Sequence, residues 1–254
     1  MGTTYNTDTI VLKQFDLGEA DKIITFCSRD RGQIRAVARN ARKSGRFSGA
    51  VQPFNYNNIT FYQGKSLARI NHVENKYSFS TLREDLVKMS YASYMAEVVS
   101  KVGVEGEPQP GLFSLLLSCF HKLISARRDN FPWINIIFKL RVLSITGHRP
   151  RLDYCPDCGS MIRANQKYCF DIAGGGLFCS SCCRGNGEEI IQLSPASLEV
   201  MKKYLDSGFN IPREFDHPDQ VLKTLDSLLD KFITYHLDIG IKSLEFLHTI
   251  ENLG

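Results

Sequence analysis

The fold of the N-terminal part is decided by the segment IITFCSRDRGQIRAVAR, residues 23–39. Its first part, Ile23 to Cys27, is rich in β-branched and aromatic residues, which favour strands. Asp30-Arg31-Gly32 then predicts a hairpin turn, because Gly32 accepts a positive φ without steric cost. From Ile34 to Arg39 the side chains alternate in character, which predicts a return strand with one buried face.

Three further strand segments flank this hairpin: Thr9 to Phe15 before it, and Phe54 to Tyr62 and Leu67 to Val73 after it. Five strands of this length within about 75 residues fit a small closed barrel, because closure removes exposed sheet edges. The sequence therefore predicts an OB-type barrel, with an SH3-like barrel as the alternative.

Beyond residue 80 the hydrophobic period becomes helical. Thr81 and Glu84 match a capping box at the start of the first helix. A later helix begins at Pro132 and is apolar all round, which predicts a central, buried position. The last helical region, 221–250, is expected to be interrupted or kinked near Gly240.

Together these segments predict an α+β protein with three parts. An OB-fold nucleic-acid-binding domain is expected at residues 1–80 and an α-helical domain at 81–254. A cysteine-rich, metal-binding insertion within the helical domain is expected at 150–190.

The charge is distributed unevenly along the chain. The 254 residues carry a net charge of +4, and 43% hydrophobic with 23% charged residues is typical of a globular protein rather than a disordered, collagen-like or coiled-coil chain. Residues 1–80 contain 12 Lys+Arg and 6 Asp+Glu, whereas residues 81–254 contain 19 and 21. Seven cations and a single acid lie between residues 29 and 46, so the positive charge is concentrated on one segment.

This basic segment is a candidate phosphate-binding surface. Arg35 and Arg39 are four residues apart on the expected strand and therefore share a face, opposite a face with Ile34. Arginine suits the site because its planar fork matches phosphate geometry and stacks on bases. The alternative is a solvated strand face followed by a flexible loop. The candidate nucleic-acid-binding residues are Arg31, Arg35, Arg39, Arg42, Lys43 and Arg46.

Four aromatic residues of the expected barrel have two possible roles. Aromatic side chains on barrels of this kind stack on single-stranded bases, but small barrels are also filled by such side chains. We expect a core role for these four residues, which are Phe54, Tyr56, Phe61 and Tyr62.

Two Cys-x-x-Cys pairs, Cys155 with Cys158 and Cys179 with Cys182, are separated by 20 residues. This spacing is typical of a four-cysteine zinc site, in which each knuckle directs two thiolates at one ion. Gly159 suits the tight turn of the first knuckle, and Gly174-Gly175-Gly176 suits a turn between the knuckles. A site closed by four thiolates has no open coordination position, so we expect a structural zinc ion.

The other cysteines leave alternatives open. Cys183 is a possible replacement for Cys182 as fourth ligand, and Cys169 a possible contributor. A redox dithiol and a disulfide are both disfavoured, the latter because we expect a reducing compartment. Cys27 and Cys119 fit small buried hydrophobic positions.

The sequence favours a cytoplasmic protein without catalytic activity. Residues 1–9 lack the apolar stretch of a signal peptide, and no run of 18 apolar residues predicts a membrane span. Dinucleotide-binding, zinc-protease and serine-hydrolase motifs are missing, and the six histidines are scattered.

The chain resembles the RecO family of bacterial DNA-repair proteins over nearly its whole length. The resemblance rests on the order and spacing of TDTIVL (7–12), GEADKIIT (18–25), GQIRAVAR (32–39), ARK (41–43), RF (46–47) and QPF (52–54), on the two cysteine pairs, and on HL (236–237) with KSLEFL (242–247).

The resemblance implies an OB-fold, a helical domain and a zinc-binding insertion. It also implies a recombination mediator that binds single- and double-stranded DNA, anneals complementary strands, acts with RecR, and helps load RecA on strands coated by single-strand-binding protein. Two departures from the family pattern stand out. Asn40 replaces a glycine common in relatives, which keeps the turn because asparagine tolerates a left-handed conformation. The doubled Cys182-Cys183 leaves the fourth ligand open, and some relatives lack these cysteines.

Three functional hypotheses follow. The leading one is a non-catalytic DNA-binding and annealing mediator. The alternative is an RNA-binding or ribosome-associated factor, because barrels with zinc ribbons also serve there. A zinc-dependent hydrolase would require an open metal position, which four thiolates do not leave.

Overall fold

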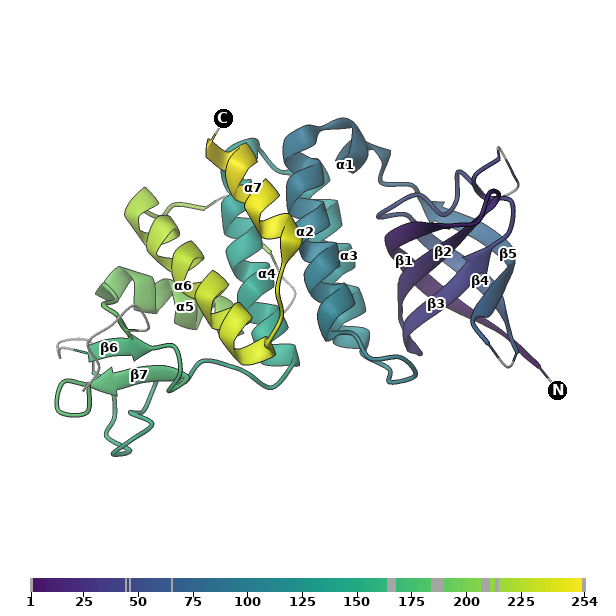
Figure 1. Cartoon of the computed structure of the whole chain (residues 1–254). Helices are drawn as coiled ribbons and strands as arrows, with labels where there is room; N and C mark the ends of the chain where they lie inside the picture. The colour runs from purple at the N-terminus through teal and green to yellow at the C-terminus, as the bar shows by residue number, and fades with distance from the viewer. Residues whose placement is uncertain are drawn as a thin grey trace. The chain divides into compact units, whose positions relative to one another are not determined.

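The fold is taken from a computed structural model that describes residues 2–43, 45, 47–64, 66–163, 168–183, 190–206, 211–212 and 215–252. The chain forms two compact units (Figure 1). The first contains Met1–Ala126 and Ile241–Gly254, and the second contains Arg127–Gly240.

A five-stranded closed barrel occupies the N-terminal part of the first unit. Its strands are β1 (Thr3–Leu17), β2 (Asp21–Ser28), β3 (Gly32–Ala38), β4 (Tyr56–Gln63) and β5 (Ala68–Tyr77). Their order is β1-β2-β3-β5-β4, and the long strand β1 pairs with both β2 and β4 to close the barrel. Only β3 and β5 run parallel. This is the arrangement of an OB fold, so the prediction of an OB-type barrel is confirmed and the SH3-like alternative is not needed.

The barrel interior is filled by one apolar cluster, because alternate residues of each strand point inward. Phe61 is fully buried in this cluster, and Phe54 is buried just before β4. Tyr56 packs edge-to-face on Phe113, while Tyr62 is exposed at the end of β4. The expected core role is therefore confirmed for Phe61. Phe54 is buried outside this cluster, against Phe120, while Tyr56 is half-buried and Tyr62 lies at the surface.

Four helices complete the first unit: α1 (Ser80–Glu84), α2 (Leu86–Val102), α3 (Pro110–Ser125) and α7 (Lys242–Asn252). The predicted capping box is wrong, since α1 follows Phe79 in a left-handed conformation and has no side-chain cap. Asp85 instead caps the longer helix α2 by accepting hydrogen bonds from the backbone N–H groups of Val87 and Lys88. Helix α7 packs along α2 (Figure 1).

The second unit contains helices and a small sheet. The helices are η1 (Arg128–Asn130), α4 (Phe131–Ile145), α5 (Pro195–Asp206) and α6 (Asp219–Leu237), and α4 packs against α5 and α6. The strands β6 (Tyr168–Asp171), β7 (Gly176–Cys179) and β8 (Ile190–Ile191) form an antiparallel sheet in the order β7-β6-β8.

Two helical predictions are confirmed in this unit. Helix α4 is buried on nearly all sides, and α6 ends at Leu237, so the last helical region is interrupted around Gly240. One feature of α4 was missed: Lys139 lies in its middle and is fully buried. No helix in the described ranges is long and apolar enough to cross a membrane.

Candidate nucleic-acid interface and metal centre

The basic segment begins where the hairpin turn was predicted. Gly32 has a φ of +66°, and Asn40, beyond the end of β3, has a φ of +56°, as expected for both positions. Ile34, Ala36 and Ala38 point into the barrel core, which directs Arg35 outward into solvent. The predicted alternation of β3 is therefore confirmed.

The strand register relates this surface to the two neighbouring strands. Lys13 of β1 lies opposite Thr25 of β2, which in turn lies opposite Arg35. Thr25 itself is fully buried, so Lys13 and Arg35 are the exposed members of this row. The neighbouring outward row consists of Phe15, Ile23 and Val37. Residues paired across strands share a face, so we call Lys13, Phe15, Ile23, Arg35 and Val37 the β1–β3 face.

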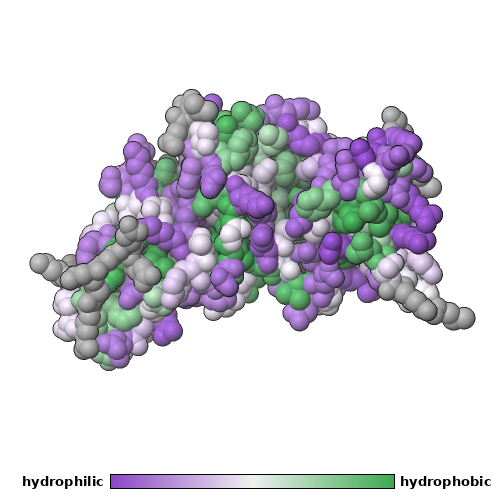
Figure 2. Space-filling model, in the orientation of Figure 1, coloured by the Kyte–Doolittle hydropathy of each residue, from purple (hydrophilic) through white to green (hydrophobic). Residues whose placement is uncertain are grey.

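The β1–β3 face combines cations with exposed apolar surface. Phe15 is 57% exposed although it is an aromatic residue in a strand. Figure 2 shows apolar side chains gathered over the region where Figure 1 labels β1, β2 and β3, with hydrophilic side chains around them. Such a surface suits single-stranded nucleic acid, because bases stack on aromatic side chains and phosphates pair with the cations beside them.

Helix α2 adds a further cation to this face. Partial burial, together with the positive charges of Lys101 and Arg35, lowers the pKa of Lys13. The nearby carboxylate of Glu97 is already engaged, because it accepts hydrogen bonds from the backbone N–H groups of Lys242 (3.1 Å) and Ser243 (2.8 Å). The positive field at Lys13 is thus only partly compensated, which favours an anionic ligand.

The other predicted residues of the segment have different surroundings. Arg31 lies over the ring of Tyr5, 4.2 Å from its centroid. Arg42 pairs with Asp16 at 3.3 Å and donates to the carbonyl oxygen of Gly18, so it helps to hold the β1–β2 hairpin.

The remaining cations of the segment are at the surface or outside the described ranges. Arg39 and Lys43 are exposed and form no ion pair within the part of the chain that the structure describes. Arg46 lies outside the described residues.

The two Cys-x-x-Cys pairs come together in the second unit. The Sγ atoms of Cys155, Cys158, Cys179 and Cys182 all lie within 4.8 Å of one another. Each knuckle is closed by a backbone hydrogen bond, from Gly159 to Cys155 (2.9 Å) and from Cys182 to Cys179 (3.0 Å). Gly159 has a φ of +71°, as the tight turn requires.

The geometry of this cluster fits a metal ion bound by four thiolates. A tetrahedron with Zn–S bonds of ~2.3 Å places its sulfur atoms about 3.8 Å apart. The Sγ atoms of Cys158 and Cys179 are 3.7 Å apart. Hydrogen bonds from the side chain and backbone of Ser160 lower the pKa of the Cys158 thiol to about 6, whereas the side-chain contact with Cys158 raises the pKa of the Cys182 thiol. A metal bound by all four cysteines would therefore have to displace the proton of Cys182.

Cys169 and Cys183 form a disulfide, so the expectation that no disulfide would form is wrong for this pair. Strand β6 places Cys169 opposite Phe178, next to the second knuckle, and the Cα atoms of the two cysteines are 6.1 Å apart. Cys183 therefore does not replace Cys182, and Cys169 does not contribute to the cluster. Cys27 and Cys119 are buried among apolar residues, as predicted.

Sequence reasoning missed Lys13, Phe15 and Lys101. Lys13 and Lys101 lie far from the basic segment in sequence, and Phe15 was assigned only to a strand. A β-bulge between Val11 and Lys13 shifts the register and turns Lys13 and Phe15 outward. A bulge of this kind has no dependable local signal, so only the three-dimensional pairing identifies these residues.

Comparisons with known proteins agree with this architecture. The family models described as "Recombination protein O N terminal" and "Recombination protein O C terminal" match residues 1–79 and 83–245. The chain is 35% identical to the DNA repair protein RecO of Symbiobacterium thermophilum over 250 residues, 98% of each chain. It is 34% identical to that of Desulforamulus reducens, over 98% of this chain and 97% of the relative. For Bacillus pumilus the identity is 30%, with coverage of 97% and 94%.

Proposed function

Because this chain belongs to the RecO family of DNA repair proteins, we propose that it is a non-catalytic mediator of recombination. It binds single- and double-stranded DNA, anneals complementary strands, and acts with RecR. It helps to load RecA on strands coated by single-strand-binding protein, in the cytoplasm and in association with the nucleoid. The relatives are named DNA repair proteins, so the RNA-binding alternative is not favoured.

The observation that carries this proposal is the β1–β3 face. Its cations lie beside an exposed aromatic ring on the face that OB folds use for nucleic acids. We assign phosphate contacts to Lys13, Arg35 and Lys101, and to the basic segment through Arg31, Arg39, Lys43 and Arg46. Arg42 contributes positive charge while it holds the β1–β2 hairpin.

This surface provides a mechanism for annealing. Cations that neutralise the phosphates of two strands raise the local concentration of both strands. Contacts to phosphate carry no sequence information and leave most base edges free to pair. No step of this mechanism makes or breaks a covalent bond.

We divide the chain into an OB-fold DNA-binding domain (1–80), a helical domain (81–254) and a metal-binding insertion (150–190). The insertion holds a structural zinc ion through Cys155, Cys158, Cys179 and Cys182. Four thiolates fill the coordination sphere of zinc and leave no position for a substrate. The helical domain is assigned to protein partners.

Reversing two charges of the basic segment is expected to weaken DNA binding. If about five phosphates of a single strand are neutralised, log affinity falls with log salt with a slope near −3.5. In Arg35→Glu/Arg39→Glu the slope is expected to become about 1.4 shallower, because two contacts are lost. The affinity in about 0.1 M salt is expected to fall about tenfold or more, as measured by fluorescence anisotropy with an oligonucleotide. An unchanged affinity and slope would contradict the assignment of this surface.

The control carries the same change of charge elsewhere. Arg127→Glu/Arg128→Glu alters two exposed arginines of the second unit and is expected to leave the slope unchanged. Competition between DNA and RNA oligonucleotides of one sequence separates the DNA assignment from an RNA-binding role.

Annealing of complementary strands coated by single-strand-binding protein is expected to be accelerated without ATP. The reason is that the reaction requires only charge neutralisation and proximity. Strand annealing is followed by fluorescence of labelled oligonucleotides, and Arg35→Glu/Arg39→Glu is expected to lose the acceleration. A rate equal to the uncatalysed rate for the unmodified protein would count against a mediator.

A further inference from the structure

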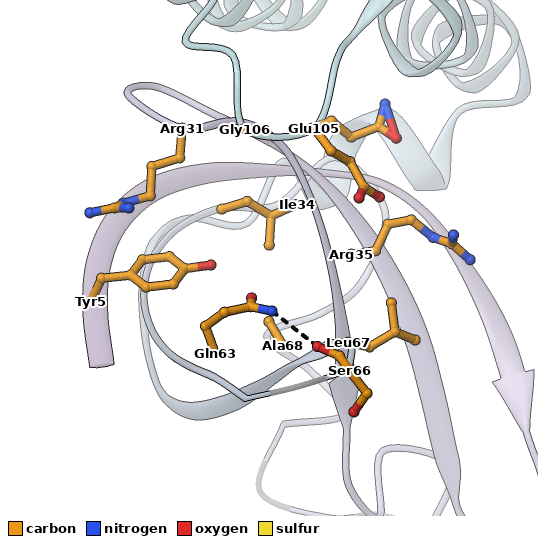
Figure 3. Close-up of a pocket in the computed structure, with 11 residues that line it drawn as sticks. Tyr5, Arg31, Ile34, Arg35, Gln63, Ser66, Leu67, Ala68, Glu105 and Gly106 are labelled. Carbon is orange, nitrogen blue, oxygen red and sulfur yellow. Dashed lines mark hydrogen bonds between the residues drawn. The ribbon is translucent and has the colours of Figure 1, made fainter. Parts of the chain in front are cut away.

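A cavity of about 370 Å³ opens at one end of the barrel, within the first unit (Figure 3). It exists because β3 pairs with β5 at Ala36 and Val37, in the second half of β3. The first half of β3 therefore separates from the β4–β5 side, and the cavity lies between them.

The walls of this cavity differ in chemistry. Ile34, Leu67 and Ala68 give it apolar surface. Tyr5 points into it, with Arg31 lying over the tyrosine ring, and Arg35 stands on the opposite side (Figure 3). The mouth is therefore flanked by two arginines and one aromatic ring.

Among the described residues that line the wall, Glu105 is the single acidic one, and it enters from the connector between α2 and α3 (Figure 3). Gln33 fixes the connector on β3 through two hydrogen bonds. Its backbone N–H donates to the carbonyl oxygen of Val104 in the connector, and its side-chain amide donates to the carbonyl oxygen of Ser100 in α2, both at 2.9 Å. A Cβ at Gly32 would lie 2.4 Å from the Val104 carbonyl oxygen, so only glycine allows this approach. Glu105 forms no ion pair with any residue the structure describes.

The charges restrict what the cavity can hold. Two arginines at the mouth attract the phosphates of a strand, whereas the exposed Glu105 carboxylate repels phosphate from its own side of the opening. A cavity of this size suits one small ligand with apolar faces, and an unpaired base meets this description. The carboxylate accepts two parallel hydrogen bonds, and guanine is the base whose Watson–Crick edge presents two adjacent N–H donors, N1–H and the N2 amino group.

We propose that this cavity receives one unpaired guanine base of a single strand, with Glu105 as the residue that determines its preference. The inference rests on the proposed function and refines it. A base held by its Watson–Crick edge is not paired in a duplex, so the cavity distinguishes single from double strands. Pairing with a complementary strand withdraws the base, which releases the DNA once annealing is complete.

The test compares short oligonucleotides that differ in one base. A thymidine oligonucleotide of about ten nucleotides with a central guanine is expected to bind the full-length protein about tenfold more tightly than thymidine alone. In Glu105→Gln this preference is expected to fall to about twofold or less, while affinity for the thymidine oligonucleotide is retained. Glu107→Gln, on the same exposed connector but outside the cavity, is expected to keep the full preference.

Each result bears on the proposal. An oligonucleotide with 1-methylguanine, which lacks the N1–H donor, is expected to bind like thymidine alone. Equal affinity of the unmodified protein for all oligonucleotides would overturn the cavity assignment but leave the proposed DNA binding intact. Loss of binding to every oligonucleotide would overturn both. Competition by micromolar deoxyguanosine monophosphate would identify a free nucleotide as the ligand and overturn the assignment to a strand.

Discussion

Replacing Cys182 with serine is expected to reduce bound zinc from one ion per chain to less than about a tenth of an ion after dialysis against a chelator. The adjacent replacement, Cys183→Ser, is expected to leave one ion per chain. The reason is geometric: the Sγ of Cys182 lies in the four-cysteine cluster, whereas Cys183 is joined to Cys169. Metal content measured by mass spectrometry on both variants checks the prediction. The reverse pattern, with zinc lost only from Cys183→Ser, would contradict the ligand assignment.

Loss of the metal is expected to unfold its surroundings rather than abolish DNA binding. The sheet β7-β6-β8 is small, so little apolar surface is available to hold the two knuckles in place. Zinc binding to such sites supplies about 10–16 kcal/mol in isolated modules, and that free energy is also folding free energy. Cys182→Ser is therefore expected to show faster hydrogen exchange at 153–162 and 176–183, measured by mass spectrometry, with DNA affinity of the barrel maintained. A fall in DNA affinity equal to that of Arg35→Glu/Arg39→Glu would contradict a purely structural ion.

Local sequence signals predicted the features that depend on neighbouring residues. Gly32 and Asn40 occupy the positive-φ positions expected from their backbone preferences, and Arg35 faces solvent because Ile34 must face the core. The cysteine spacing predicted the cluster for the same reason, since each knuckle is a local turn. The closed barrel was predictable because five short strands must hide their edges.

Features that depend on pairing between distant segments were not predictable from sequence. The row from Lys13 to Arg35 depends on a β-bulge and on the register of three strands. The disulfide between Cys169 and Cys183 depends on where β6 places its cysteine. The capping box at Thr81 failed because the left-handed turn at Phe79 decides where α1 begins, and Asp85 competes as the cap of the longer helix.

Lys139 is the clearest example of a residue that sequence reasoning could not interpret. Helix α4 is apolar around it, so a single lysine there is indistinguishable from an exposed one in the sequence. In the structure its Nζ atom lies 2.7 Å from Asp226 and 2.5 Å from Asp230, both on α6. Within the second unit this contact therefore joins α4 to α6.

Lys139→Met is expected to destabilise the second unit by about 3–5 kcal/mol, because it removes the Lys139 charge from the buried Asp230 and the partly buried Asp226. The chain has a single tryptophan, Trp133 of α4, so its fluorescence during urea unfolding reports on this unit. The triple variant Lys139→Met/Asp226→Asn/Asp230→Leu is expected to recover most of the loss, because it leaves none of these three charges without a partner and replacing a buried ion pair with uncharged residues is often neutral. The control is Lys223→Met, which replaces an exposed lysine of α6, the helix that carries both aspartates. It is expected to change the free energy of unfolding by less than about 0.5 kcal/mol. If Lys139→Met resembled Lys223→Met, the two aspartates would have to be stabilised by other groups, and the lysine would not be what holds α4 to α6.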